Sequence, residues 1–262
     1  MQTSPDPEQA QAGSCGIAVM AKASTPGSSK TRLVPPLTPD EAARCNTAFL
    51  RDVADNMLAA AAQTPVAGYM AFGPPEARPF FRETFPHGIG LIDAWYPSLG
   101  DCLLSTITQL FALGHSSAIV LNADSPTLPT SLLVETVGVL QQPGDRVVLG
   151  PADDGGYYLL GVKRAHRRLF QDIAWSTERV AQQTLDRAAE LRLPVHLLST
   201  WYDVDDIRAL KMLLAELFED QPFAPGLRPN RPRHTRELMR SLLESSDLSE
   251  RLGGAALPRA AE

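Results

Sequence analysis

The sequence lacks the features that define several large classes of protein. Its 262 residues include only three cysteines, Cys15, Cys45 and Cys102, and no CxxC pair. An odd number of widely spaced cysteines disfavours both a disulfide framework and a zinc ribbon, so free thiols in a reducing cytoplasm are expected. No apolar run approaches the roughly 18 residues of a membrane-spanning helix. The sequence therefore predicts a protein that has no membrane segment.

Positive charge is scarce as well. The chain has 24 Lys and Arg residues against 30 Asp and Glu residues, which gives a net charge of −6. A protein that neutralises a nucleic-acid backbone needs a basic surface, so broad nucleic-acid binding is not expected, although a local basic pocket for one small anion stays open. The polar start, MQTSPDPEQAQAGS, has no basic segment followed by an apolar one. We therefore expect no signal peptide and a cytoplasmic location; oligomeric state is left open.

Several local catalytic signatures are missing. The five histidines form no HExxH or other local metal pattern, and GxSxG and GxGxxG are both absent. The segment GSSKT (27–31) resembles a P-loop but lacks its required glycine, because Ser29 stands directly before Lys30. These absences remove local support for a zinc enzyme, a nucleophilic hydrolase and a P-loop enzyme.

Apolar strand-like runs alternate with amphipathic helix-like segments along most of the chain. A capping box at Thr38–Glu41, with proline at the first helical position, predicts the start of the first helix, which should run to about residue 62. This alternation predicts an α/β fold, a Rossmann-like GT-A three-layer α/β/α arrangement with a mostly parallel central sheet. The predicted strands are 15–21, 66–72, 88–94, 116–123, 146–150, 157–162 and 194–199, and the later predicted helices are 100–114, 130–140, 177–191, 207–217 and 234–245.

Composition divides the chain into three parts. We expect a flexible tail over residues 1–14, one nucleotide-diphospho-sugar transferase-like domain over 15–220, and an extension over 221–262. The extension begins with the Pro- and Arg-rich segment QPFAPGLRPNRPRHTR and carries one short predicted helix. Because this segment offers little apolar surface, a chain that ends after Glu219 is expected to keep a folded core.

The loop after the first predicted strand is a candidate phosphate-binding site. Parallel α/β sheets bind ligands at the carboxyl ends of their strands. Lys22, Gly27, Lys30 and Arg32 all fall within this one loop. Cations supply charge for a phosphate, and a glycine allows its backbone N–H to approach closely. The alternative interpretation is a solvated polar loop.

Three aspartates that follow predicted strands are candidate metal ligands. Asp124 ends the strongly apolar run SSAIVLNA, and Asp203 and Asp205 lie in WYDVDD after the last predicted strand. Carboxylates at this edge of a sheet suit Mg²⁺ or Mn²⁺, which also takes ligands from substrate phosphates. The alternatives are a turn aspartate at Asp124 and a helix N-cap at Asp205.

The segment PADDGGYYLLG (151–161) is a weaker candidate. Asp153 and Asp154 are adjacent carboxylates that precede Gly155 and Gly156, and glycines permit positive φ or close approach of a ligand. The alternative is an ordinary Asp-Gly hairpin turn. Trp175, in the predicted helix start WSTE, could stack on a substrate ring or lie in the core, with Ser176 or Thr177 as the helix cap.

Five stretches together resemble a known family, and they occur in the family's order over roughly residues 15–215. They are MAKASTPGSSKTRL (20–33), LNADSPTLP (121–129), LGPADDGGYYLLGV (149–162), IAWSTERV (173–180) and WYDVDDIRAL (201–210). The string resembles bacterial GT-A-like glycosyltransferases associated with radical-SAM proteins, including those in arsenosugar-type gene neighbourhoods. That family is distantly similar to nucleotidyltransferases that build precursors of molybdenum cofactor and coenzyme F420.

The resemblance implies a nucleotide-diphospho-sugar transferase fold and a set of roles. Lys22, Lys30 and Arg32 would bind nucleotide phosphates, Asp124 would hold the metal with Asp203 or Asp205, and residues 153–156 would line the acceptor or sugar side. The family's GDLGxR stretch appears here as GDCLLST (100–106), which keeps Gly100 and Asp101 but neither the later glycine nor the arginine. Asp101 remains a candidate nucleotide-binding residue, and Asn122 stands where the family usually has glycine.

Three functions follow as hypotheses. The first is metal-dependent transfer of a glycosyl group from a nucleotide-diphospho-sugar to a small acceptor, with Asp153 or Asp154 as the base. The second is nucleotidyl transfer from an NTP to a phosphorylated acceptor with release of pyrophosphate. The third, favoured by the altered GDCLLST segment, is nucleotide binding without catalysis. Release of a nucleoside diphosphate rather than pyrophosphate would separate the first from the second.

Overall fold

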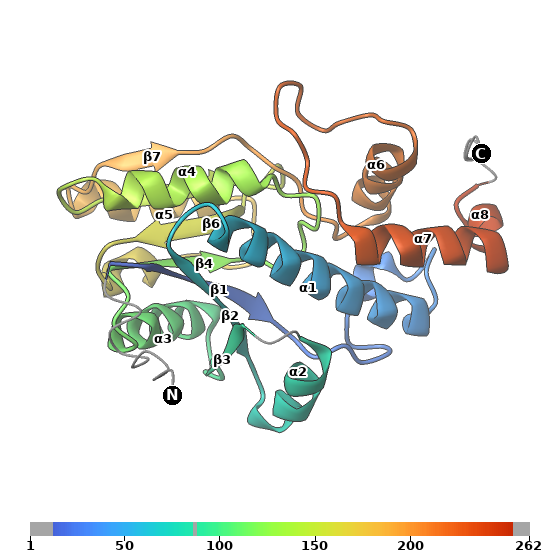
Figure 1. Cartoon of the computed structure of the whole chain (residues 1–262), viewed down its shortest axis with the longest axis horizontal. Helices are drawn as coiled ribbons and strands as arrows, with labels where there is room; N and C mark the ends of the chain where they lie inside the picture. The colour runs from blue at the N-terminus through green and yellow to red at the C-terminus, as the bar shows by residue number, and fades with distance from the viewer. Residues whose placement is uncertain (1–12, 86–87, 254–262) are drawn as a thin grey trace, which may run out of the picture.

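The computed structural model describes residues 13–85 and 88–253. Most of the predicted N-terminal tail, residues 1–12, lies outside the described residues. The chain forms a seven-stranded sheet with helices on both faces (Figure 1). Among the described residues, no helix is long and apolar enough to cross a membrane.

The predicted strands and long helices are all present, with ends that differ by a few residues. The capping box at Thr38 is also present, because its hydroxyl accepts a hydrogen bond from Glu41 N and Glu41 returns one to Thr38 N. The strands are β1 Cys15–Ala21, β2 Val66–Phe72, β3 Ile89–Asp93, β4 Ser117–Leu121, β5 Val147–Pro151, β6 Tyr157–Val162 and β7 Val195–Leu197. The helices are α1 Pro39–Ala61, α2 Arg78–Thr84, α3 Leu99–Ala112, α4 Thr130–Gln141, α5 Val180–Glu190, α6 Ile207–Phe218, α7 Arg233–Ser245 and α8 Leu248–Arg251.

Two details of the helices differ from the sequence prediction. Helix α5 begins at Val180 rather than at 177, because the Thr177 hydroxyl donates to Ala174 O and accepts from Arg179 N within a preceding turn. The short helix α2 follows β2 and was not predicted; Phe81 from this helix is buried against Phe72.

The strand order is β3-β2-β1-β4-β6-β5-β7. All neighbours are parallel except β6, which runs antiparallel to both β4 and β5. The reason is the connection between β5 and β6, residues 152–156, which is too short for a crossover and closes instead as a hairpin. The prediction of a mostly parallel sheet is therefore confirmed, with one antiparallel strand beside its centre.

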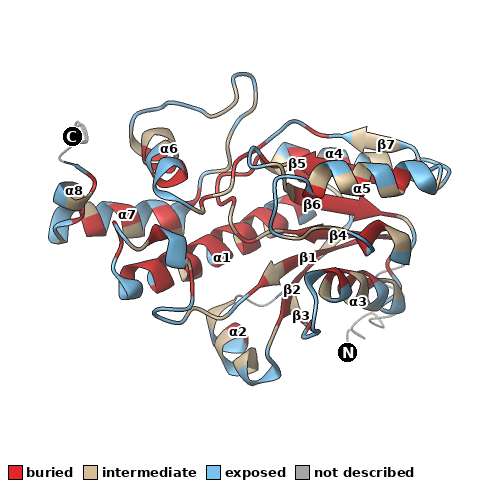
Figure 2. Cartoon of the chain, turned by 180° about the vertical axis from the view of Figure 1, so that it is seen from behind, coloured by how far each residue is buried: buried red, intermediate tan, exposed pale blue. Residues whose placement is uncertain are grey.

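The sheet separates two apolar layers. In β1, Ile17 and Val19 pack toward the layer of α1, α4, α6 and α7, whereas Ala18 packs toward the layer of α3 and α5. This alternation follows from the period of two residues in a strand. The buried strands and the inner faces of the helices are visible as the red band in Figure 2. With both faces covered, the carboxyl ends of β1 and β4 are left at one edge of the sheet, and this edge holds the site described below.

The C-terminal extension packs onto the core. Met239 and Leu242 of α7 and Leu248 of α8 are buried in the same apolar layer as α1. The N-terminus of α7 is bound by Asp52 of α1, whose carboxylate accepts hydrogen bonds from His234 N, Thr235 N and the Thr235 hydroxyl. Burial raises the pKa of Asp52, and these hydrogen bonds oppose that rise. The extension therefore contributes to the core, and a chain that ends after Glu219 would uncover one side of α1.

We expect Met239→Ala to lower the free energy of unfolding by about 2–5 kcal/mol, because the substitution leaves a cavity between α7 and α1. Arg240→Ala, which changes an exposed residue on the same helix, should alter stability far less. Urea denaturation of both variants and of a chain ending after Glu219 measures this. Wild-type stability in the shortened chain would show that the packing of α7 is dispensable.

Candidate functional site

A cavity of about 1040 Å³ opens at the carboxyl ends of β1 and β4 and extends past β6 to the turn before α5. A second cavity of about 310 Å³ adjoins it under the loop that follows β1. The predicted site residues that line the larger cavity are Lys22, Arg32, Asp124, Asp154, Gly156, Trp175, Asp203 and Asp205. Residues far apart in the sequence thus meet at one place, as strand-end geometry predicted.

The ammonium group of Lys30 lies between two carboxylates of the site. Its Nζ is 2.7 Å from Asp124 Oδ1 and 2.9 Å from Asp205 Oδ1, and it donates to Val204 O at 2.9 Å. Burial alone would lower the pKa of Lys30, but the two carboxylates raise it above its ordinary value. Lys30 has φ of 50°, a left-handed conformation that is uncommon for a residue with a side chain. Lys30 is therefore a buried cation that holds the two aspartates side by side.

This placement changes what the loop after β1 offers to a phosphate. The three N–H groups of the Lys30 ammonium already have three acceptors, so a phosphate could reach it only by replacing one of them. Lys22 and Arg32 are exposed, line both cavities, and have no ion-pair partner among the described residues. Gly27 is exposed at φ of 76° and lies outside both linings, so it shapes the loop.

Asp203 lies deeper than the other two aspartates. Its Oδ1 accepts hydrogen bonds from Asn122 Nδ2 at 2.6 Å and from the Ser125 hydroxyl at 2.5 Å. Burial, with a smaller contribution from the charge of Asp124, raises the pKa of Asp203 to about 7, against the opposing effect of the Ser125 and Asn122 hydrogen bonds. Asn122 Oδ1 is buried without a hydrogen-bond partner among the described residues. Asn122 was not predicted as a site residue.

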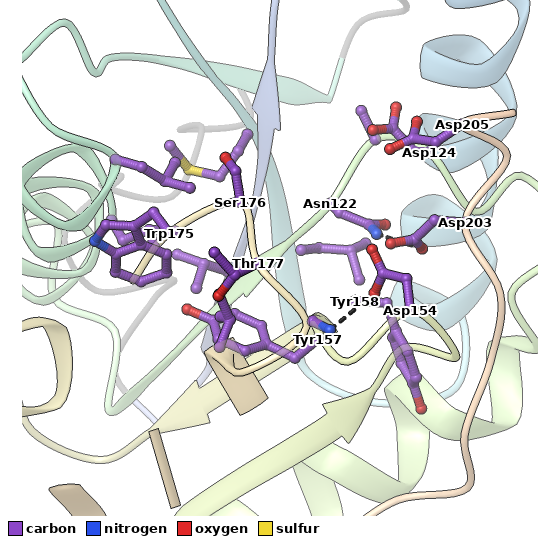
Figure 3. A pocket seen from close by; sticks show the side chains of 18 of the residues that line it. Asn122, Asp124, Asp154, Tyr157, Tyr158, Trp175, Ser176, Thr177, Asp203 and Asp205 are labelled. Carbon is purple, nitrogen blue, oxygen red and sulfur yellow. Dashed lines mark hydrogen bonds between the residues drawn. The ribbon is translucent and has the colours of Figure 1, made fainter. Parts of the chain in front are cut away.

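The three predicted metal ligands are only partly brought together. Figure 3 shows Asp124 beside Asp205, with Asp203 set apart next to Asn122. A different group in the described residues has the spacing of a metal site. It consists of Asp52, Asp55 and His234, whose potential ligand atoms all lie within 4.8 Å of one another. That group surrounds the N-terminus of α7, where Asp52 already accepts three hydrogen bonds. Asp124 and Asp205 thus offer a two-carboxylate site, completed only by a ligand.

The turn between β5 and β6 separates its four candidate residues. Asp154 and Gly156 line the cavity, and Gly156 N donates to Asp154 Oδ1 at 2.8 Å. Asp153 does not line it and instead lies 3.3 Å from Arg208. Gly155, at φ of 89°, lies so close to the backbone of Glu178 that a Cβ would be 2.2 Å from Glu178 O. Residues 152–156 therefore form the hairpin turn between β5 and β6, and two of them, Asp154 and Gly156, also line the cavity.

Asp101 is not brought to the cavity. It lies in the first turn of α3, where its N–H donates to the Ser98 hydroxyl and its carboxylate accepts from that hydroxyl. Trp175 does line the cavity, together with Tyr157, which the sequence analysis had assigned only to a strand. Tyr158 also belongs to the lining, and the position of both tyrosines directly after the candidate residues 153–156 is the signal that could have identified them.

Comparison with known proteins identifies the fold. The structure matches the crystal structure of a candidate nucleotide-diphospho-sugar transferase from Desulfovibrio desulfuricans G20, with a TM-score of 0.75 and 24% identity, over 92% of this chain and 98% of that one. It also matches CMP:2-keto-3-deoxy-manno-octonic acid synthetase complexed with CTP, with a TM-score of 0.50 and 14% identity, over 80% of this chain and 100% of that one. At these identities the matches establish a Rossmann-like α/β fold.

Sequence comparison adds a family of unassigned activity. Residues 56–177 match the family described as an uncharacterized protein conserved in bacteria, DUF2064. The matched region contains Asp124, Asp154 and Trp175 but ends before Asp203, and it begins after Lys30. No protein of curated function matches the chain.

The structure separates the roles of adjacent aspartates in WYDVDD. The N-cap of α6 is Asp206, which accepts from Ala209 N, and not Asp205, as one interpretation of the sequence held. We expect Asp206→Ala to cost about 1 kcal/mol of stability, because it removes a helix cap, and to leave ligand binding intact. If Asp205 takes part in binding a metal and a nucleotide, as proposed below, Asp205→Asn should weaken that binding instead. Thermal melts paired with calorimetry test this; the assignment fails if the two effects are exchanged.

The raised pKa of Asp203 predicts a pH-dependent loss of stability. An aspartate in the unfolded chain has its proton removed near pH 3.8, whereas folded Asp203 keeps it to about pH 7. The stability that this group provides is therefore fully present below pH 3.8 and is lost as pH rises to about 7, by up to about 4 kcal/mol.

The matched variant is Asp203→Asn, which cannot ionise. In metal-free buffer, the difference in unfolding free energy between Asp203→Asn and wild type should grow in favour of the variant from about pH 4 to pH 7 and then level off. Asp186→Asn, at an exposed position on α5, provides the control. A difference that does not vary with pH would contradict the raised pKa.

Proposed function

We propose that this protein is a transferase that takes a glycosyl group from a nucleotide-diphospho-sugar to a small acceptor. The observation that carries the proposal is the convergence of Asp124 and Asp205, with the exposed Lys22 and Arg32 nearby, on one large cavity at the strand ends. A nucleoside diphosphate needs cations for its phosphates and a carboxylate-bound metal to neutralise the remaining charge. The similarity in fold to a candidate nucleotide-diphospho-sugar transferase supports the same class.

Asp124 and Asp205 fit a weakly bound Mg²⁺ or Mn²⁺. In each aspartate, Oδ1 contacts the Lys30 ammonium group, and the second carboxylate oxygen is left to bind another ligand. Mg²⁺ is commonly held by one or two carboxylates plus substrate phosphates, so a site of two carboxylates fits an ion that arrives with the nucleotide. When bound, the ion would supply positive charge beside the diphosphate.

The chain's own residues would do the remaining work. Lys22 and Arg32 would hold the phosphates and stabilise the leaving diphosphate by charge-assisted hydrogen bonds. Asp154 is the candidate base for the acceptor hydroxyl, because it lines the cavity whereas Asp153 is paired with Arg208. Lys30 would hold the side chains of Asp124 and Asp205 in position before the substrate binds. The free-energy cost of ordering these two side chains is then not incurred during the reaction.

Calorimetric titration of nucleoside diphosphates with Mn²⁺ and with EDTA tests the proposal. Wild type should bind at least one diphosphate more tightly with Mn²⁺, and Asp124→Asn should lose that dependence while remaining folded. Arg32→Ala should weaken binding by about 1.5–3 kcal/mol, because it removes a charge-assisted contact. Asp186→Asn is the control. Equal binding with and without metal in wild type would refute the metal site.

Product analysis distinguishes the transferase types. A free nucleoside diphosphate is the expected product, whereas pyrophosphate would assign the site to nucleotidyl transfer from an NTP. Binding without turnover of any donor would favour a nucleotide-binding protein that does not catalyse. The association with radical-SAM proteins stays a prediction of the sequence resemblance.

A further inference from the structure

One end of the large cavity differs chemically from the carboxylate end. Tyr157 and Trp175 line it, and the nearby lining residues Met20, Leu99 and Leu103 are apolar. Figure 3 shows Tyr157, Thr177 and Trp175 on the opposite side of the view from Asp124, Asp203 and Asp205. The cavity therefore has a carboxylate end and an aromatic end, and Ser176, Thr177, Glu178 and Arg179 also belong to its lining.

The hydroxyl of Tyr157 is buried and has no hydrogen-bond partner among the described residues. Burial also raises the pKa of this phenol, so the hydroxyl keeps its proton and remains a donor. A buried polar group without a partner destabilises the folded chain, and phenylalanine at this position would avoid that cost. Because Tyr157 is one of the residues that line the cavity, a ligand bound there would supply the missing acceptor.

The indole of Trp175 is held in place by its surroundings. A Cβ at Gly100 would be 3.1 Å from Trp175 Nε1 and 2.9 Å from Phe170 O, so only glycine leaves room for the ring at the start of α3. The backbone N–H of Trp175 donates to Ile173 O at 3.0 Å. An aromatic ring fixed in this way at a cavity wall offers a surface for another ring without a large cost of ordering.

We propose that the Tyr157–Trp175 end of the cavity binds a planar, uncharged ring that carries a hydrogen-bond-accepting oxygen. The ring lies against Trp175, and its oxygen accepts the hydrogen bond of the Tyr157 hydroxyl. The face of Trp175, with the apolar Met20, Leu99 and Leu103 nearby, favours contact with a flat ring. This proposal rests on the proposed function in one respect, because it assumes that part of a substrate binds at this end of the cavity. Two sources have the required chemistry, namely the nucleobase of a donor and an aromatic acceptor.

Calorimetry with uncharged probes tests the proposal on the full chain. The probes are uridine, cytidine, adenosine and guanosine as the nucleobase source, and 4-hydroxyacetophenone as the aromatic source. At least one probe should bind to wild type, Tyr157→Phe should weaken it about three- to tenfold, as loss of one hydrogen bond predicts, and Trp175→Leu should weaken it further. Tyr96→Phe, which removes a phenol hydroxyl bonded to Ser105 outside the cavity lining, should bind as wild type does.

The stability of the free protein gives a second readout. Tyr157→Phe should melt at the same temperature as wild type or higher, because it removes a buried hydroxyl that lacks a partner. A lower melting temperature, unchanged probe affinity in Tyr157→Phe, or no binding of any probe would each overturn the proposal.

These results are independent of the diphosphate test. The probes carry no phosphate, so Asp124→Asn should bind them as tightly as wild type does. Probe binding without any diphosphate binding would contradict the proposed function but support the ring site. Diphosphate binding without any probe binding would contradict the ring site but not the proposed function.

Discussion

The ammonium group of Lys30 joins three segments that the sequence keeps far apart. It contacts Asp124 at the end of β4 and both Val204 and Asp205 in the segment before α6, while its own backbone belongs to the loop after β1. Without this cation, Asp124 and Asp205 would be like charges placed side by side, and their repulsion would oppose the backbone hydrogen bond from Val204 N to Asp124 O that joins their segments. The close approach of the two carboxylates at this end of the cavity depends on this contact.

The same contact explains how charge is distributed over the site. Lys30 is committed to the carboxylates, so the exposed Lys22 and Arg32 are the cations left to meet an incoming phosphate. Within the described part of the chain no cation pairs with Asp203, which is held by the neutral Asn122 and Ser125, and this is consistent with its raised pKa. Lys22 and Arg32 line the cavity together with Asp124, whereas Tyr157 and Trp175 lie on the opposite side of the view in Figure 3.

The C-terminal extension packs against α1 and stabilises that part of the fold. Asp52 of α1 accepts three hydrogen bonds at the start of α7, and Met239 then fills the space between the two helices. A buried carboxylate at a helix N-terminus is favoured by the helix dipole and by the free N–H groups there. The same geometry makes Asp52, Asp55 and His234 resemble a metal site, although Asp52 is already occupied by the helix.

The sequence by itself determined the alternation of strands and helices, the capping box at Thr38 and the edge of the sheet that holds the polar residues. These follow from local periodicity and from the rule that parallel strands open toward the same side, so they need no knowledge of distant contacts. It also identified the loop after β1 and both aspartate segments as candidates. The Asp-Gly hairpin alternative is compatible with β6 running antiparallel to β5, but the pairing of β6 with β4 joins segments far apart in the chain and leaves no local signal.

Only the tertiary structure decided which of the adjacent residues face the cavity. Asp153 and Asp154 have the same chemistry and neighbouring positions, yet one pairs with Arg208 and the other lines the cavity. Lys30 and Arg32 are likewise equivalent in the sequence, but burial beside two carboxylates makes the first an internal cation. The burial of the Tyr157 hydroxyl without a partner is a property of several packed segments together. Such distinctions depend on long-range packing, which residue type and spacing do not encode locally.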